Sequence, residues 1–481
     1  MTQNNLYDQK ALKDQSLRNN EYYTTQDIFD KLYQDSKNGK IFNNLMSLII
    51  STENLTLAFR NIKGNKGSKT AGINKHTIDK WSNESVDIYI SYMRNRFENY
   101  IAMPVRRVEI PKPNGKKRPL GIPTIEDRLI QQSIKQVLEP ICEAKFYDHS
   151  YGFRPNRSTE HAISYFSSKI NLVKCRYIVD VDIKGFFDNV NHGKLLKQIW
   201  AMGIRDKQLI SIISKMLKAP ISDKGILTPN NKGTPQGGIL SPLLSNIVLN
   251  ELDWWIATQW VDMKSRNNPF NLGLDKHGRI INSNKYSRLR QKSKLKEIYI
   301  VRYADDFKII CRTKTDATRI FIATQQWLKE RLKLDISPEK SGITDIRRST
   351  TEFLGFSLKA HLKRQKYVLQ SHICNKAKTK IQQTISDAII KMQKHPNLNT
   401  VGRYNSIILG IQNYYRIATQ VSRDLGDIAY ILSKKLKVRL KAIKKDKGSL
   451  SNFYKSRYKN NYKVIFVAQI ALFPLADIQT K

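Results

Sequence analysis

The sequence predicts a mixed fold of the α/β or α+β class, in which strands and helices alternate along the chain. Short runs rich in β-branched and aromatic residues, such as residues 177–183, alternate with longer segments of helical periodicity, such as residues 126–144. No fixed-period repeat is visible, which argues against a solenoid. With 481 residues, the chain is long enough for about three domains with sizeable cores.

The charge balance indicates a polyanionic partner. Lys and Arg number 83 against 41 Asp and Glu, a formal net charge of +42, which is more than solubility requires. Membranes are also anionic, but the sequence has no long apolar run and no signal-peptide core. We therefore expect an intracellular protein, of the cytoplasm or an organellar matrix, that is not secreted and has no membrane partner. The four cysteines are far apart without a C-x-x-C pair, so we expect reduced, partly buried thiols.

The N-terminal region is expected to be helical up to about residue 60, with Thr25 and Ser51 as helix caps. A basic, glycine-bearing loop follows at residues 61–72 and is suited to phosphate contacts through Lys63, Lys66 and Lys69. A solvated linker is the alternative interpretation of this loop.

The middle of the chain alternates strands and helices. Asn114-Gly115 between two apolar runs predicts a hairpin, and a glycine-rich turn at residues 232–238 opens a helix. The expected elements are strands at 105–110 and 116–122, a helix at 126–144, a loop at 151–155, a strand at 177–183, and helices at 194–202, 207–217 and 243–255. Residues 262–297 are polar and basic and resemble a surface insertion.

The C-terminal part has a different composition. Residues 360–481 contain 24 Lys and Arg, 5 Asp and no Glu, a local net charge of +19, which predicts a separate, mainly helical basic module. Its run at 434–441 spaces apolar residues among cations, including Lys434, Lys435 and Lys437, as a helix facing RNA or DNA would. A merely solvated helix face is the alternative.

Two adjacent carboxylates, Asp305 and Asp306, are expected at the tip of a hairpin between apolar runs at 298–301 and 307–311. Adjacent carboxylates raise each other's pKa unless a cation lies between them. A third carboxylate, Asp182, is expected in the earlier strand at residues 177–183. Three such carboxylates would suit two Mg²⁺ ions roughly 3.5–4 Å apart. The alternatives are a harmless acidic turn and an N-capping Asp182. A calcium loop starting at Asp180 is excluded, because Lys184 and Asn191 occupy ligand positions.

Further residues are candidates for nucleotide binding. The ring of Phe187 is suited to stack under a sugar and exclude a 2′-hydroxyl, with packing in the core as the alternative. Phe186 is expected in the core. Gln236 lies in a Pro-Gln-Gly-Gly turn whose glycines allow close backbone approach. Lys112 and Arg118 flank the hairpin and can neutralise a triphosphate.

Six ordered sequence blocks resemble the reverse transcriptase blocks of group II intron-encoded maturases. They are 110–112 (IPK) with 118–123 (RPLGIP), 151–155 (YGFRP), 182–188 (DIKGFFD), 235–238 (PQGG), 303–306 (YADD) and 353–356 (FLGF). Residues 61–74 resemble the N-terminal extension of this family, and residues 403–419 resemble its thumb or maturase domain. The resemblance therefore covers nearly the whole chain.

The resemblance implies an α+β right-hand polymerase that extends a DNA primer on an RNA template with two Mg²⁺ ions and dNTP, and that binds its intron RNA and a DNA target. It implies metal-binding roles for Asp182, Asp305 and Asp306 and nucleotide-binding roles for Lys112, Arg118, Phe187 and Gln236. Lys340 is implied, less directly, as a proton donor to pyrophosphate. The implied domains are a helical N-terminal extension (1–90), fingers (91–175), a palm of antiparallel sheet plus helices (176–360), a helical thumb (361–445) and the start of a DNA-binding region (446–481).

One feature departs from the family pattern. Many relatives continue into an HNH endonuclease with cysteine pairs, whereas this sequence stops at Lys481. It either belongs to an endonuclease-free lineage or is a shortened copy of a longer protein, and we expect the second. An alternative function is an RNA-binding splicing cofactor with a vestigial polymerase site. A palm-fold nucleotide cyclase is a weaker alternative, since it needs no finger hairpin or basic thumb. The sequence does not disclose which RNA or DNA target is bound, whether splicing or cDNA synthesis dominates, or the oligomeric state.

Overall fold

The computed structural model describes residues 16–111, 115, 117–263, 286–287, 289–291, 293–443, 448–458 and 464–477. The chain divides into two compact units, which are described separately. Unit 1 consists of Met1–Arg157, Asp180–Lys308 and Thr318–Gly342, and unit 2 of Ser158–Val179, Ile309–Ala317 and Ile343–Lys481. The predicted mixture of helices and strands is confirmed.

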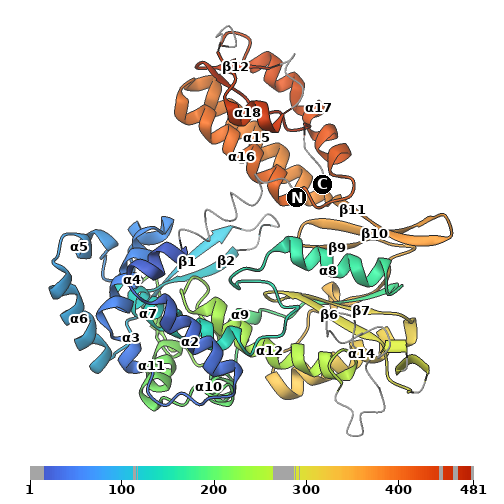
Figure 1. Cartoon of the computed structure of the whole chain (residues 1–481). Coiled ribbons are helices and arrows are strands. Elements are labelled where there is room, and N and C mark those ends of the chain that lie inside the picture. The colour runs from blue at the N-terminus through green and yellow to red at the C-terminus, as the bar shows by residue number, and fades with distance from the viewer. Residues whose placement is uncertain are drawn as a thin grey trace. The chain divides into compact units, whose positions relative to one another are not determined.

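The first part of unit 1 is helical and is organised around the buried helix α7 (Figure 1). Asn54 donates to the Ser133 carbonyl (3.1 Å) and Ser36 to the Ile141 carbonyl (2.8 Å), which fixes two neighbouring helices to α7. Ser51 caps α4 as predicted, but the Thr25 hydroxyl donates to the Asn20 carbonyl and does not cap α2. These helices are α2 (Gln26–Lys37), α3 (Met46–Ile49), α4 (Thr52–Lys63), α5 (Ile78–Ser82), α6 (Val86–Glu98) and α7 (Ile125–Glu143).

The expected loop at residues 61–72 is only partly a loop. Its first three residues end α4, and Lys66–Lys69 form a 3-10 turn, η1. The glycine and lysine content of this segment suggested a loop. The helix continues because the apolar Ile62 is fully buried on the inner face of α4.

The predicted hairpin is present as β1 (Val105–Pro111) and β2 (Lys117–Ile122), which are antiparallel with Ile110 opposite Arg118. A second hairpin, β4 (Ile221–Asp223) and β5 (Ile226–Thr228), extends this sheet in the order β2-β1-β4-β5. The helices of this part of the chain are α9 (Phe186–Asn189), α10 (His192–Ala201), α11 (Lys207–Leu217) and α12 (Ser241–Gln259). Helices α10, α11 and α12 match the predicted ones to within a few residues, whereas the short helix α9 was not predicted.

A second sheet has the strand order β6-β7-β3-β8. Strands β3 and β7 contain residues of both units. β6 is almost completely buried, and α12 packs against it. The strands of this sheet are β3 (Tyr177–Val181), β6 (Ile298–Tyr303), β7 (Asp306–Cys311) and β8 (Gly342–Asp345). Between β7 and β8 along the chain come α14 (Lys314–Trp327), the π-helical turn η2 (Leu328–Leu332) and η3 (Pro338–Lys340).

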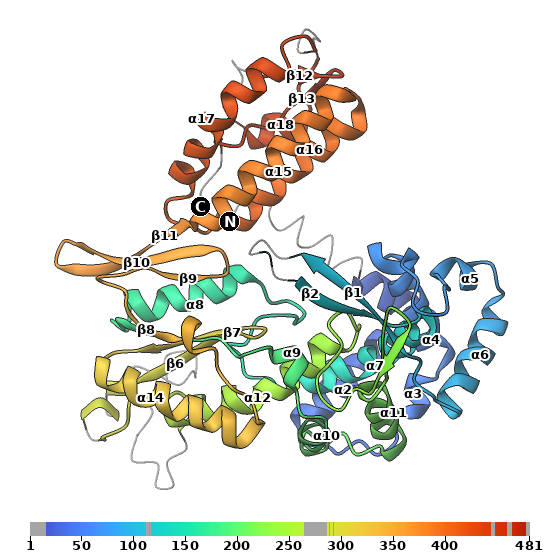
Figure 2. The same cartoon turned by 180° about the vertical axis from the view of Figure 1, so that it is seen from behind.

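Unit 2 combines a small antiparallel sheet with a helical bundle (Figures 1 and 2). α8 (Thr159–Asn171) packs on this sheet, and Asn171 accepts a hydrogen bond from the Leu369 N–H (2.8 Å). The sheet contains β9 (Thr351–Phe353), β10 (Phe356–Lys363) and β11 (Lys366–Ile373) in the order β11-β10-β9. The bundle contains α15 (Asn375–Lys394), α16 (Leu398–Tyr415) and α17 (Val421–Arg439), with α18 (Asn452–Arg457) and the short pair β12 (Phe466–Val467) and β13 (Ile470–Ala471).

The basic module contains the helices α15 to α18, in keeping with its predicted helical character, but it does not begin with a helix. The expected boundary at residue 360 falls inside β10, and a β-hairpin precedes the first helix of the module. Along β10, Phe356, Leu358 and Ala360 are buried and alternate with more exposed residues, a period of two that the count of cations obscured. Helix α8, expected among the fingers, belongs to unit 2. The expected domain limits all stay predictions.

All four cysteines are free and buried, as predicted. None of the helices in the described ranges is long and apolar enough to cross a membrane. Most of the expected insertion at 262–297 lies outside the described residues.

Candidate active site

The Asp-Asp pair lies at a tight turn between β6 and β7, as the sequence predicts. Ala304 adopts a left-handed backbone conformation (φ +60°), which a non-glycine residue rarely adopts without support from its surroundings. This turn leaves Asp305 between the strands and Asp306 at the first position of β7.

Asp182 directly follows β3, and a neighbouring loop holds its backbone. The Asp182 N–H donates to Ser341 Oγ (3.0 Å), and its carbonyl accepts from the Ser337 N–H (2.8 Å). The same loop carries Lys340, whose Nζ lies 3.2 Å from Asp182 Oδ2. The chain segment after β3 is therefore coupled to the segment that supplies this lysine.

The structure brings Asp182, Asp305 and Asp306 to one cavity of about 250 Å³. The remaining lining residues are Asp180, Val181, Lys308 and Lys340. Lys308 forms an ion pair with Asp180 and lies 3.8 Å from an oxygen of Asp306. The sequence interpretation did not assign Asp180 or Lys308 to the site. Strand alternation could have found both, since each lies two positions from a predicted carboxylate.

The cavity modifies the acidity of the hairpin carboxylates. Loss of hydration, together with Asp180, Asp305 and Asp182, raises the pKa of Asp306 to about 6, whereas Lys308 opposes this shift. The side chain of Asp306 remains 47% exposed, so it is partly hydrated rather than sealed. Desolvation and the charge of Asp182 also raise the pKa of Asp305, while Arg118 and Arg302 lower it. Cations therefore favour the charged form that a metal would require.

The donor set suits a hard divalent cation, which prefers carboxylate oxygens. Within the described ranges, however, no group of three His, Cys, Asp or Glu side chains is already arranged as a coordination shell. Lys340 instead contacts Asp182, and Lys308 contacts Asp180 and Asp306. Metal binding would thus require Lys340 to leave Asp182 and the carboxylates to turn toward one centre.

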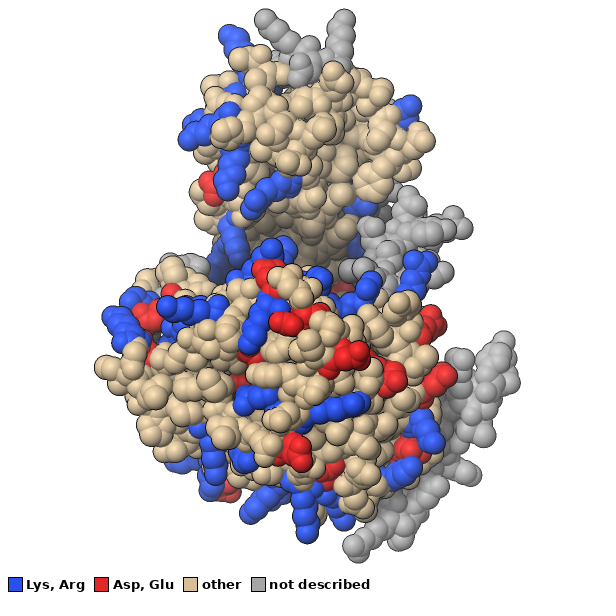
Figure 3. Space-filling view, turned by 90° about the vertical axis from the view of Figure 1, so that its left-hand side faces the viewer, with Lys and Arg blue, Asp and Glu red and all other residues tan. Residues whose placement is uncertain are grey.

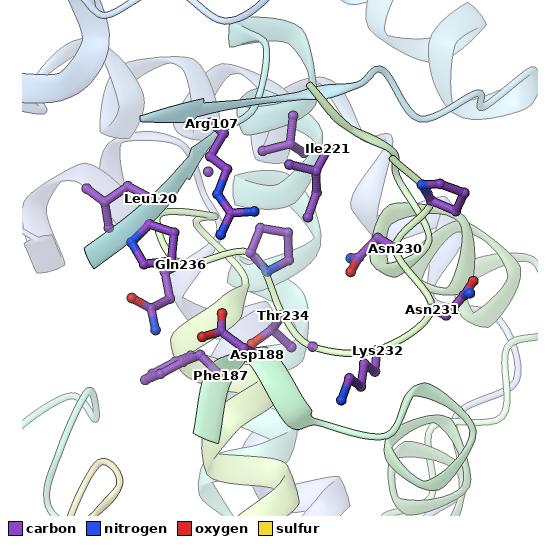
Figure 4. A pocket seen from close by; sticks show the side chains of 16 residues that line it. Arg107, Leu120, Phe187, Asp188, Ile221, Asn230, Asn231, Lys232, Thr234 and Gln236 are labelled. Atoms are coloured by element: carbon purple, nitrogen blue, oxygen red, sulfur yellow. The ribbon is translucent and has the colours of Figure 1, made fainter. Parts of the chain in front are cut away.

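A second cavity in unit 1, of about 360 Å³, contains two of the predicted nucleotide-binding residues, Phe187 and Gln236 (Figure 4). Phe187 is 9% exposed and Phe186 is 2% exposed, so Phe186 is in the core as predicted. Arg107 and Lys232, which the sequence interpretation did not single out, also line this cavity. In Figure 4, the guanidinium of Arg107 points from its strand into the cavity, toward the side on which Gln236 lies.

The Pro-Gln-Gly-Gly turn packs tightly against β2. Gly237 has φ +113°, and a Cβ on it would lie 2.6 Å from the Gly121 carbonyl oxygen, so only glycine fits there. Arg118 Nε donates to Gln236 Oε1 (2.9 Å). The positive charge of Arg118 also lowers the pKa of Asp305. This arginine therefore interacts both with the Gln236 turn and with the carboxylate cavity. Lys112 lies outside the described residues.

The predicted RNA-binding lysines differ in their surroundings. Lys63, Lys66 and Lys69 are exposed, and Lys69 lies 3.9 Å from Asp79. On α17, Lys434 and Lys437 are exposed, three positions apart.

Lys435 differs from its two neighbours, because it is half-buried and contacts Ser386 on α15. Each turn of α17 has a buried and an exposed side, and Lys435 lies between the two. Its RNA-binding role stays a prediction. On the face shown in Figure 3, Lys and Arg side chains are distributed among uncharged and acidic residues.

Two family models match the chain. The model described as "Reverse transcriptase (RNA-dependent DNA polymerase)" matches residues 110–358, which include the whole carboxylate cavity and most of the second one, and "Type II intron maturase" matches residues 358–464. The chain belongs to the group II intron-encoded reverse transcriptases. The resemblance seen in the sequence blocks is thereby confirmed.

Curated relatives agree with this assignment. "Group II intron-encoded protein LtrA" of Lactococcus lactis subsp. cremoris is 32% identical over 89% of this chain and 79% of its own length. "Protein YkfC" of Escherichia coli (strain K12) is 34% identical over 63% of this chain and 79% of its own length. "Putative COX1/OXI3 intron 2 protein" of Saccharomyces cerevisiae is 29% identical over 82% of this chain and 51% of its own length. The family identifies an RNA-directed DNA polymerase with roles in intron splicing and mobility.

Proposed function

We propose that this reverse transcriptase extends a DNA primer on an RNA template at the cavity formed by Asp182, Asp305 and Asp306, and that it binds its intron RNA to assist splicing and mobility. The observation that carries the proposal is the convergence of these carboxylates from two chain segments more than 100 residues apart, beside Lys308 and Lys340. Both segments lie in the region that matches the reverse transcriptase family.

The proposed architecture is a right hand. The β1–β2 hairpin and its flanking helices would be the fingers, the sheet β6-β7-β3-β8 with α12 the palm, and the bundle α15–α17 the thumb. Support comes from the order of these elements along the chain and from the maturase match that begins at residue 358.

The three aspartates would hold two Mg²⁺ ions, and bound Mg²⁺ would activate the primer 3′-hydroxyl and neutralise charge on the leaving pyrophosphate. Asp182 and Asp305 would face the primer side, and Asp306 would complete the shell of carboxylates. Lys340 would leave Asp182 and contact the phosphates of the dNTP. Its side chain is long, flexible and 62% exposed, which allows this movement. Lys308 would stay paired with Asp180 and limit repulsion among the acids.

The nucleotide would lie against Phe187 and Gln236. Phe187 lies on the short helix α9 and lines the second cavity. Its ring would reject a 2′-hydroxyl there by steric exclusion. Arg118 orients Gln236 by a hydrogen bond and, with Lys112, would meet the triphosphate. Lys63, Lys66, Lys69, Lys434 and Lys437 would contribute to RNA binding through phosphate contacts.

Primer extension on an RNA template tests this proposal. Replacing Asp305 by Ala should reduce dNTP incorporation on the order of 10³-fold, because it removes a carboxylate from the cation site. Asp30→Ala is the matched control, since Asp30 is an exposed acid on α2 whose recorded hydrogen bond is to Gln26. Full incorporation by Asp305→Ala would refute the proposal.

Splicing by the same variant separates the polymerase from the alternative, a splicing cofactor with a vestigial polymerase site. The +19 charge of residues 360–481 is the observation that favours an RNA-binding role. An enzyme with both roles should keep splicing assistance and lose cDNA synthesis in Asp305→Ala. A pure cofactor would show no cDNA synthesis in the unaltered protein either.

A further inference from the structure

The Tyr-Gly-Phe-Arg-Pro loop packs directly against the Asp-Asp turn, although the proposed chemistry gives this loop no role. A Cβ on Gly152 would lie 2.2 Å from the Ala304 nitrogen and 2.8 Å from the Tyr303 carbonyl carbon. The Tyr151 N–H donates to the Arg302 carbonyl (2.8 Å), and the Arg302 N–H donates to the His149 carbonyl (3.1 Å). The loop thus pairs with the end of β6 and touches the backbone of the turn itself.

The side chain of Arg302 links this turn to α12. It is 1% exposed, and its guanidinium donates to both oxygens of Asp253, at 2.6–2.9 Å. Nη1 of the same guanidinium donates to Asn246 Oδ1 (2.9 Å) and to the carbonyl of Ala304 (2.8 Å). Asn246 donates in turn to the Gly152 carbonyl (2.9 Å). One buried charge therefore contacts the left-handed residue of the turn, the helix behind it and, through Asn246, the loop beside it.

A second arginine fixes the loop from its other end. Arg154 donates through Nη1 to the carbonyls of Tyr147 (2.6 Å) and Ser150 (2.7 Å), and its Nε and Nη2 donate to Glu143 on α7. The loop is consequently held to α7 by charge-assisted hydrogen bonds and to β6 by backbone hydrogen bonds.

We propose that these residues form a positioning network, the hairpin buttress (Gly152, Arg154, Asn246, Asp253 and Arg302), which sets the affinity of the carboxylate cavity for a divalent cation. The left-handed backbone at Ala304 is costly and persists only if its surroundings impose it. Arg302 and Gly152 act on the residue directly before Asp305, so a loosened buttress misplaces both carboxylates. This inference rests on the proposed function, because it assumes that the carboxylates bind the cation.

Mn²⁺ binding, measured by the electron paramagnetic resonance of the free ion, tests the buttress without relying on catalysis. The double variant Arg302→Met/Asp253→Leu replaces the buried ion pair by apolar groups of similar size, a change that buried pairs often tolerate without loss of stability. It also removes the bond to the Ala304 carbonyl. We expect a melting temperature within a few degrees of the parent and Mn²⁺ affinity weakened about tenfold or more. Unchanged affinity in the folded double variant would overturn the inference.

Gly152→Ala provides an independent variant, with Gly448→Ala as its matched control. A Cβ on Gly448 would lie 2.2 Å from the Gln469 carbonyl oxygen, as close a clash as at Gly152, but in unit 2. Gly152→Ala should weaken Mn²⁺ binding about tenfold, and Gly448→Ala should leave it unchanged. Equal effects from the two glycine variants would mean general loss of structure and would also overturn the inference.

Asp305→Ala distinguishes a failure of the buttress from a failure of the proposed function. If Asp305→Ala abolishes Mn²⁺ binding while the buttress variants bind normally, only the buttress is wrong. If Asp305→Ala binds Mn²⁺ like the parent, the proposed metal site itself is wrong.

Discussion

The carboxylate cavity of unit 1 and the lysines of α17 in unit 2 show two different uses of charge. In the cavity, Asp180, Asp182 and Asp306 lie within ion-pair distance of lysines, and a buried network holds the turn that carries Asp305. On α17, by contrast, Lys434 and Lys437 are exposed side chains on a helix surface. In the cavity, the exact position of each charged group determines what it can bind. On α17, the total positive charge determines how strongly the helix attracts a polyanion. Variants of the two regions should therefore differ in both the size and the kind of their effects.

The largest effect is expected from Asp182→Asn. This change keeps the size of the side chain but removes the negative charge beside Asp305, and we expect kcat for primer extension to fall on the order of 10³-fold. RNA affinity should stay unchanged, as measured by filter binding. An equal loss of RNA binding would remove the distinction between the two regions.

Phe187→Ala should have the next largest effect, on selectivity rather than on rate. Removing the ring that lines the nucleotide cavity should lower the preference for dNTP over NTP on the order of 10- to 100-fold. The ratio of kcat/KM values for dTTP and UTP on one template measures it. Phe186→Leu is the control, because this neighbouring ring is in the core, and it should change stability more than selectivity. Unaltered discrimination in Phe187→Ala would remove this residue from the nucleotide site.

The α17 lysines should act additively through salt-dependent binding. Lys434→Ala/Lys437→Ala should weaken RNA affinity about tenfold and reduce the slope of log affinity against log salt by about 0.7 per lysine. Lys435→Ala is the internal control, because Lys435 contacts Ser386 and is half-buried. It should lower the melting temperature and leave the slope unchanged. A slope that is the same in the double variant and the parent would contradict phosphate contacts by these lysines.

The smallest effect concerns pH. The pKa of Asp306 is raised to about 6, so this carboxyl becomes protonated as the pH falls through 6, and a protonated carboxyl is a poor metal ligand. Mn²⁺ affinity should therefore be full near pH 7.5 and about fourfold weaker at pH 5.5 from this group alone. Asp306→Asn should bind more weakly at both values and lose that part of the pH dependence. An affinity that rises on acidification would contradict the assigned direction.

Local periodicity was sufficient to predict much of the fold and of the site. The alternation on either side of Asp305 and Asp306 predicted the hairpin, and Asn114-Gly115 predicted the β1–β2 turn region that joins two observed strands. The sequence blocks also placed Phe187 and Gln236 in one region, and they line one cavity.

The parts that escaped prediction depend on contacts between distant segments. Arg302 is a cation in a strand, and its ion pair with Asp253 depends on the packing of α12 against β6. Strand alternation places Asp180 and Lys308 near the predicted carboxylates, but it does not show that these two residues pair with each other. Likewise, the cations Lys359 and Lys363 of β10 concealed its alternation, because charged residues on the outer face of a strand raise the count without revealing the period. A single sequence therefore predicts the types of the elements better than it predicts which side chains of distant elements pair with each other.

The central claim is that Asp182, Asp305 and Asp306 together bind the catalytic divalent cation. Anomalous X-ray diffraction from crystals soaked with Mn²⁺ and a non-hydrolysable dNTP analogue tests it most directly. The account predicts Mn²⁺ peaks within bonding distance of all three carboxylates, with Lys340 withdrawn from Asp182 and the Arg302 bond to the Ala304 carbonyl intact. Mn²⁺ bound elsewhere, with Lys340 still on Asp182, would contradict it.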